Sequence, residues 1–184
     1  MTQSETPTTP EVRPLSLEDF REDAHALDDG TFAVRHGRAF FLHHGVLGDL
    51  QPARRGRPTL LIDGEPSDLG SVRPDFLVFP IRAAGRAGAG SFVSIGRTDS
   101  NDIIINDVSV SKFHAFCRVT PEGAVAILDS GSSNGTYVNG IAVPKHGGGE
   151  PVHLSPGDSV RLGSVRLSFL PLAPFRRMLL DLDR

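Results

Sequence analysis

The sequence DSGSSNGTYVNG occupies residues 129–140. It contains two Asn-Gly pairs, at Asn134-Gly135 and Asn139-Gly140, and Asn-Gly is a strong tight-turn signal because both residues tolerate a positive φ. The three residues between the pairs, Thr136–Val138, carry β-branched or aromatic side chains, which favour a strand. This stretch therefore predicts a short strand between two turns, with polar side chains on the adjoining loops.

Similar strand candidates continue on both sides of this stretch, from Asp75 to Pro171. Several alternate between apolar and polar residues, and no helical pattern interrupts them. Short strands at turn-separated intervals predict an all-β fold, an antiparallel β-sandwich. The expected strands are Phe76–Ala83, Ser91–Ile95, Ile103–Ile105, His114–Val119, Val125–Leu128, Thr136–Val138, Val152–Leu154, Ser159–Leu162 and Val165–Leu170.

The residues before position 75 have a different character. Residues 1–15 are polar, threonine-rich and interrupted by prolines, which predicts a disordered tail. Ser16-Leu17-Glu18-Asp19 resembles a capping box and predicts a helix over residues 16–28, ended by Asp28-Asp29-Gly30. Short apolar runs then predict strands, so that residues 16–74 are expected to form a small mixed α/β region of unidentified family. These strands are Thr31–Val34, Ala39–Leu42 and Thr59–Ile62.

The last residues, 172–184, follow the expected sandwich domain of residues 75–171. Phe175, Met178, Leu179 and Leu182 share one face of a helix there. We expect a short amphipathic helix that docks on its own domain, because one short apolar stripe anchors weakly to a membrane.

Composition excludes several classes of function. The net charge of −3 provides no broad positive field for a nucleic acid. The single cysteine, Cys117, rules out a disulfide framework or a cysteine-based zinc site within the chain. Residues 1–17 lack an apolar signal segment, and no run reaches the roughly 18 apolar residues that span a bilayer. We therefore expect a soluble cytoplasmic protein that binds neither nucleic acid nor membrane.

Three motifs occur in order along the expected sandwich. Gly96-Arg97 ends an early strand, Ser111-Lys112-Phe113-His114 begins a middle strand, and Ser132-Ser133-Asn134-Gly135-Thr136-Tyr137-Val138-Asn139-Gly140 follows. With these motifs the sequence resembles the forkhead-associated (FHA) family over roughly residues 76–170. The resemblance implies a sandwich of about eleven strands whose loops at one end bind phosphothreonine peptides.

The resemblance also implies a role for each matched residue. Arg97 contacts the phosphate, Ser111 adds a hydroxyl donor and Lys112 adds positive charge, while Ser133 and Asn134 complete the site and Asn134 holds the peptide backbone. Gly96, His114 and Asn139 support the loops from behind. A phosphate needs such an array because it carries nearly two negative charges and several strong acceptors. Phe113 departs from the family, which often has a polar or basic residue there.

Other motifs suggest chemistry that their context does not support. Ser111 and His114 have the spacing of a nucleophile and a base, but no nucleophile-elbow pattern surrounds Ser111. Gly85–Ser91 lacks the lysine of a phosphate-binding loop. His43 and His44 point to opposite faces of a strand and have no carboxylate or cysteine cluster beside them. We expect no enzyme activity, no metal and no cofactor.

Two classes of function remain. The first is a phosphothreonine-dependent adaptor that binds a partner after a Ser/Thr kinase has modified it. In a narrower version, Thr6, Thr8 and Thr9 are phosphorylated and then occupy the chain's own site, as in some bacterial members of the family. The alternative is a phosphate-independent scaffold or oligomerisation protein that uses the sandwich as an interaction platform.

Overall fold

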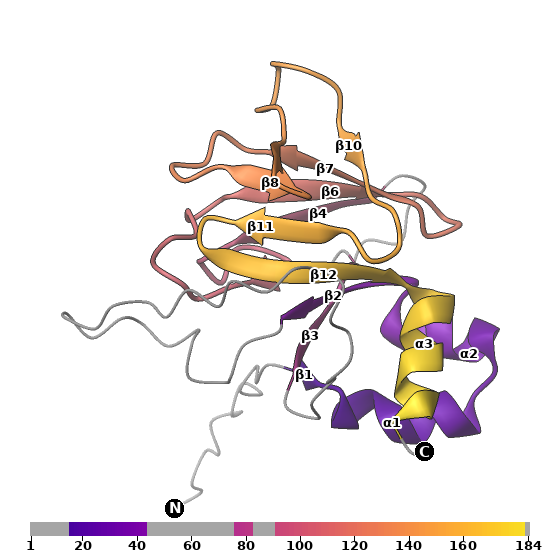
Figure 1. Ribbon diagram of the computed structural model, residues 1–184. Helices are drawn as coiled ribbons and strands as arrows, with labels where there is room; N and C mark the ends of the chain where they lie inside the picture. Colours follow the sequence, from indigo (N-terminus) through magenta and orange to yellow (C-terminus); the bar gives the residue numbers. More distant parts are fainter. Residues whose placement is uncertain (1–14, 44–75, 83–90, 183–184) are drawn as a thin grey trace, which may run out of the picture.

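A computed structural model describes residues 15–43, 76–82 and 91–182. Two β-sheets pack face to face, and three short helices lie to one side of the larger sheet (Figure 1). The seven-stranded sheet has the order β1 (Leu15–Ser16), β3 (Leu77–Pro80), β2 (Ala39–His43), β12 (Val165–Pro171), β11 (Ser159–Leu162), β8 (Thr136–Val138) and β9 (Ile141–Ala142). The five-stranded sheet has the order β10 (Val152–His153), β7 (Val125–Asp129), β6 (Ala115–Val119), β4 (Ser91–Gly96) and β5 (Ile103–Ile104).

The predicted β-sandwich is confirmed, and each of the nine expected strands between Phe76 and Leu170 overlaps an observed strand. The sequence did not predict β1 or β9. One described pairing also differs from the expected antiparallel arrangement, because β4 and β5 run parallel. Asp102 explains this return of the chain. Its carboxylate accepts hydrogen bonds from the amide and hydroxyl of Ser94, both at 2.8 Å, and so holds the start of β5 beside β4.

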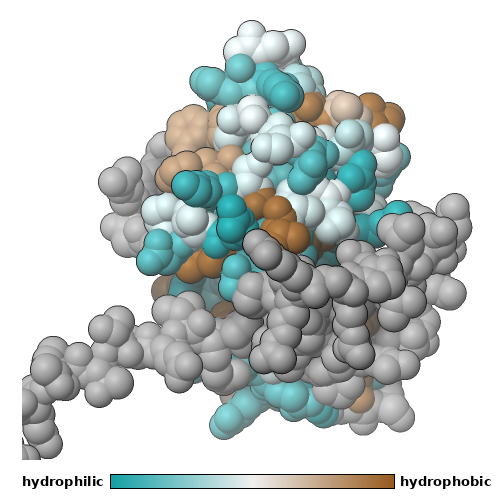
Figure 2. Space-filling view, turned by 90° about the vertical axis from the view of Figure 1, so that its left-hand side faces the viewer, coloured by the Kyte–Doolittle hydropathy of each residue, from teal (hydrophilic) through white to brown (hydrophobic). Residues whose placement is uncertain are grey.

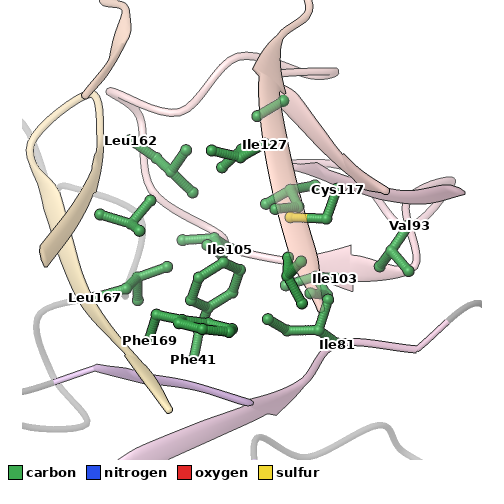
Figure 3. Packing of buried hydrophobic residues seen from close by; sticks show 14 of the residues in the cluster. Phe41, Ile81, Val93, Ile103, Ile105, Cys117, Ile127, Leu162, Leu167 and Phe169 are labelled. Carbon is green, nitrogen blue, oxygen red and sulfur yellow. The ribbon is translucent and has the colours of Figure 1, made fainter. Parts of the chain in front are cut away.

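The main hydrophobic core fills the space between the two sheets. Phe41, Leu167 and Phe169 enter it from the large sheet, while Cys117 and Ile127 face them from the small sheet (Figure 3). All five side chains are at most 1% exposed. This alternation of buried and exposed positions is the one that predicted the strands.

The N-terminal residues contribute directly to the large sheet. β2 is hydrogen-bonded between β3 and β12, and its successive side chains serve two cores. Phe41 points into the sandwich, whereas Phe40 and Leu42 point to the opposite face and pack with the helices. β2 therefore lies within the sheet although it precedes the expected boundary at residue 74; the division of the chain into domains stays a prediction.

The three helices are α1 (Glu18–Ala26), α2 (Asp29–His36) and α3 (Leu172–Asp181). The helix expected over residues 16–28 corresponds to α1, but the expected capping box is not formed: the N-cap is Leu17, which makes no side-chain cap hydrogen bond, and Ser16 donates to Asp19 through both its amide and its hydroxyl. The strand expected at Thr31–Val34 is wrong, because these residues belong to α2. Asp28 starts this second helix by accepting the Thr31 amide at 2.9 Å. The expected stop at Asp28-Asp29-Gly30 is therefore wrong, because α1 already ends at Ala26 with Leu27 as its C-cap, and Asp29 and Gly30 belong to α2.

A second hydrophobic core joins the helices to the outer face of the large sheet. Phe175 and Leu179 of α3 are fully buried in it, so the C-terminal helix docks on its own domain as expected. The rings of Phe175 and Phe40 stack with centroids 4.0 Å apart. Arg176 caps the end of α1 by donating to the carbonyls of Ala24 and Leu27.

Several predicted features lie outside the described residues. They are residues 1–14 of the expected tail, the strand expected at Thr59–Ile62, the arginines Arg54, Arg55 and Arg57, and most of the Gly85–Ser91 loop. Within the part of the chain that the structure does describe, no helix is long and apolar enough to cross a membrane.

We expect Phe175→Ala to lower the free energy of unfolding by about 3–5 kcal/mol, because it removes a fully buried ring and leaves a cavity. Urea unfolding followed by circular dichroism measures this change. Leu180→Ala in the same helix is the matched control. Its side chain is 36% exposed, so its expected loss is below about 1 kcal/mol. Equal losses in the two variants would contradict a core that depends on α3.

Candidate functional site

Three loops meet at one end of the sandwich, on the left in Figure 1. They are the 97–102 loop after β4, the 105–114 loop between β5 and β6, and the 130–135 loop between β7 and β8. The Arg97 amide donates to the Ser111 carbonyl at 2.9 Å, and the Ser133 amide donates to the Ser111 hydroxyl at 3.1 Å. The 105–114 loop is therefore tied to the other two loops through Ser111.

The structure brings four of the five predicted contact residues into this hydrogen-bonded group. Arg97 Nε donates to the Val110 carbonyl at 3.1 Å, and Asn134 Nδ2 donates to the Ser109 carbonyl at 2.8 Å. Lys112 follows Ser111 and is exposed. The side chains that were predicted from motifs far apart in the sequence thus lie on loops that contact one another.

The two cations of the site have no ion-pair partner in the part of the chain that the structure describes. Among the described residues, no carboxylate forms an ion pair with Arg97 or Lys112. In the described part of the chain, the Arg97 side chain donates one hydrogen bond, from Nε to the Val110 carbonyl. The two terminal nitrogens of its guanidinium are therefore left for a ligand. A planar group with two parallel donors matches the oxygens of a phosphate or carboxylate. The loops can therefore bind an anion.

His114 supports these loops from the interior. Its side chain is 0% exposed; Nδ1 accepts the Ser111 amide at 3.0 Å, and Nε2 lies 3.1 Å from the Gly135 carbonyl. Because Nδ1 accepts and Nε2 donates, the imidazole is neutral. Burial lowers the pKa of His114, and the Gly135 carbonyl and Asp129 oppose this effect without cancelling it.

The geometry also bears on catalysis by Ser111 and His114. His114 accepts the backbone amide of Ser111, while the Ser111 hydroxyl is hydrogen-bonded to the amide of Ser133. A nucleophile and its base must share a hydrogen bond between their side chains. These two residues do not form such a pair.

Asp129, which was not predicted from the sequence, organises the 130–135 loop. Its buried carboxylate accepts the hydroxyls of Ser132 and Thr136 at 2.6 and 2.7 Å and the amides of Gly131 and Ser132, both at 2.8 Å. Burial raises the pKa of Asp129, but these four hydrogen bonds together hold it below its ordinary value. The carboxylate therefore stays charged and fixes the start of the loop.

Gly96 and Asn101 hold the 97–102 loop against the 105–114 loop. A Cβ on Gly96 would lie 2.1 Å from the Lys112 carbonyl, so the close approach of the two backbones requires glycine. Asn101 was not predicted. Its Nδ2 donates to the carbonyls of Lys112 and Thr98 at 2.7 and 2.9 Å, and the residue is 6% exposed.

Asn139 occupies a different part of the fold. It adopts a φ of 50° in the turn after β8, donates to Asp158 at 2.8 Å and accepts the Ser159 amide at 2.9 Å. Its partners therefore lie near β11, away from the three loops. Of the two histidines considered for a metal, His43 lies in β2 and His44 is outside the described residues. The described ranges contain no group of three potential metal ligands.

Comparison with known families agrees with this arrangement. Residues 93–163 match the model of the FHA domain, so this part of the chain is an FHA domain. The chain is 40% identical over 90 residues to the ABC transporter ATP-binding/permease protein Rv1747 of Mycobacterium tuberculosis, covering 49% of this chain and 10% of that protein. It is 42% identical over 77 residues to the glycogen accumulation regulator GarA of Mycolicibacterium smegmatis, covering 42% of this chain and 44% of the relative.

Among solved structures, the FHA domain of the CT664 protein from Chlamydia trachomatis has 27% identity and a TM-score of 0.39. The match covers 46% of this chain and 80% of that one. The chain spans less than half the length of both curated relatives.

We expect the stability of the protein to fall as the pH drops below about 6.5, the ordinary pKa of histidine. The pKa of His114 is lower in the folded state than in the unfolded chain, so acid favours the unfolded chain. The contribution is complete above pH 6.5 and is lost as the pH approaches the folded-state pKa. Unfolding by urea at several values between about pH 5.5 and 7.5 measures it.

His114→Ala should flatten this pH dependence, and it should also cost about 1–3 kcal/mol at pH 7.5 through the loss of two hydrogen bonds. His153→Ala is the control, because His153 is exposed on β10. If both variants keep the wild-type slope, another group is responsible for the pH dependence.

Proposed function

We propose that the three loops bind a phosphothreonine residue of a partner protein and that the chain acts as an adaptor downstream of a Ser/Thr kinase. The observation that carries this proposal is the pair of cations, Arg97 and Lys112, which have no ion-pair partner among the described residues. Both lie on loops that are hydrogen-bonded to one another and that carry further hydrogen-bond donors. An anion with several acceptors fits such an array better than a single carboxylate does.

The Ser111 hydroxyl is suited to the phosphate. Its oxygen accepts the Ser133 amide, which orients the side chain, while its own hydrogen has no acceptor in the described part of the chain. It can therefore donate to a phosphate oxygen next to the guanidinium of Arg97. Lys112 adds charge without a fixed direction because an exposed ammonium on a flexible stem acts as a point charge.

The Asn134 side chain is suited to the peptide that carries the phosphate. Its Nδ2 is held by the Ser109 carbonyl, so its Oδ1 has a defined position and stays exposed. An oxygen in that position can accept a backbone amide of the peptide beside the phosphothreonine. Ser133, whose amide is already bonded to Ser111, offers its exposed hydroxyl next to both groups.

On this proposal the protein performs no catalysis, works in the cytoplasm and needs no cofactor. The name of the relative GarA, a regulator, is consistent with a protein that acts by binding. The support roles of Gly96 and His114 belong to the same proposal. Asn139 is proposed to act at a distance, by holding the far end of β8, whose first residue follows the 130–135 loop. The opposing hypothesis is a scaffold that binds its partner through the sandwich without any phosphate.

We expect Arg97→Ala to weaken binding of phosphothreonine peptides at least about tenfold, because it removes a charge-assisted pair of hydrogen bonds. Arg97→Lys should recover only part of the affinity, since it restores the charge without the planar fork. Isothermal titration with a phosphothreonine peptide library, and with the same peptides unphosphorylated, measures both effects.

The control for this experiment is Arg166→Ala, because Arg166 is an exposed arginine on β12 and not on the three loops. It should bind like the wild type. Ser111→Ala provides a second test at the site. Affinity that does not depend on the phosphate, or that survives both Arg97→Ala and Ser111→Ala, would support the scaffold hypothesis instead.

Thr6, Thr8 and Thr9 lie outside the described residues, and we propose that a kinase modifies one of them so that the tail occupies the site. Kinase treatment should then weaken binding of an external phosphopeptide, because a tethered ligand has a high effective concentration. The variant with all three threonines changed to alanine is the control and should bind equally before and after treatment. Unchanged affinity of the treated wild type would contradict this self-binding.

A further inference from the structure

Two large apolar side chains are exposed on the 105–114 loop. Val108 is 64% exposed and Phe113 is 57% exposed, although such residues are usually buried. They stand on either side of the segment from Ser109 to Lys112, which holds the proposed ligand contacts. Figure 2 looks onto this end of the sandwich and shows apolar surface interspersed with hydrophilic surface.

The loop holds both side chains in defined places. Before Ser109, the Asp107 carboxylate accepts the Ser109 amide at 2.7 Å and its hydroxyl at 2.5 Å. Between the two exposed residues, Val110 is 1% exposed and anchors the loop in the core. After Phe113, the His114 amide donates to the Ile95 carbonyl at 2.8 Å. Val108 and Phe113 are therefore exposed on a loop whose backbone is held in place by hydrogen bonds and by the buried Val110.

Both residues adjoin atoms that the proposed ligand uses. Val108 precedes Ser109, whose carbonyl holds Asn134, and Phe113 follows Lys112, which supplies positive charge. Elsewhere in the described ranges, the strongly exposed apolar residues belong to other elements, since Phe92 lies on β4, Ile141 on β9 and Val34 on α2. The two exposed apolar residues therefore flank, along the 105–114 loop, the segment that holds the proposed phosphate contacts.

We infer that the preferred ligand is a phosphothreonine peptide with a large apolar residue close to the phosphothreonine, which packs on Val108 or Phe113. The inference rests on the proposed function and names its ligand class. Apolar area removed from water contributes affinity in proportion to its extent, so partial burial of one such side chain should raise affinity about fivefold.

A phosphothreonine peptide set in which each flanking position carries either leucine or serine tests this inference. For the wild type, leucine at one position or more should raise the affinity about fivefold over serine. The double variant Val108→Ser, Phe113→Ser should bring this ratio close to one, with a smaller change in the affinity of the all-serine phosphopeptide. The ratio is the readout, and Ile141→Ser is the control that should preserve it.

The outcomes separate the two proposals. If the wild type binds phosphothreonine peptides but shows no preference for leucine, or if the double variant keeps the preference, the apolar contact is wrong and the phosphate site stands. If no phosphothreonine peptide binds more tightly than its unphosphorylated form, the proposed function fails, and the inference fails with it.

Discussion

The neutral imidazole of His114 is the interaction on which the loop end of the sandwich depends. It is completely buried, so both of its nitrogens need partners, and a buried polar group without a partner destabilises the fold. Its partners are the Ser111 amide and the Gly135 carbonyl, which belong to two different loops. The requirement to satisfy one buried side chain therefore fixes the separation of the loops. The buried carboxylate of Asp129 likewise needs partners, and it finds them in the amides and hydroxyls at the start of the 130–135 loop and in Thr136. These hydrogen bonds keep its pKa below the ordinary value, so the carboxylate stays charged.

The sandwich behind this loop end is built from parts of the chain that lie far apart in sequence. β2 is buried on both faces: Phe41 joins the core between the sheets, and Phe40 joins the core under the helices. The two strands that pair with β2 are β3 and β12, and both follow the 44–75 segment in the sequence. α3 then covers the outer face through Phe175 and Leu179. The FHA domain and its N-terminal residues thus share one sheet.

The sequence predicted the strands well because their signals are local. Alternating apolar residues and Asn-Gly turns indicate where a strand lies from only a few neighbouring residues. The three site motifs lie at the ends of those strands. Thr31–Val34 failed because the short apolar run is also compatible with a helix, and the cap at Asp28 decided between them. Asn101 was missed because its acceptor at Lys112 is reached only through the fold. Asp129 carried a local signal, an aspartate followed by Ser-Gly-Ser, which is typical of a side chain that caps its own loop.

The hydrogen bonds that tie the loops together have a consequence for recognition. A ligand that binds to loops already held by Ser111, Asn134 and His114 loses little affinity to ordering of the protein, so more of its contact energy appears as affinity. On the proposed function, a phosphate would supply the attraction, because Arg97 and Lys112 lack ion-pair partners among the described residues. Charge alone discriminates poorly between phosphorylated peptides, since each carries the same group. On the proposed function, discrimination comes from surface near the phosphate, and the inferred surface is that of Val108 and Phe113, the strongly exposed apolar residues of the 105–114 loop.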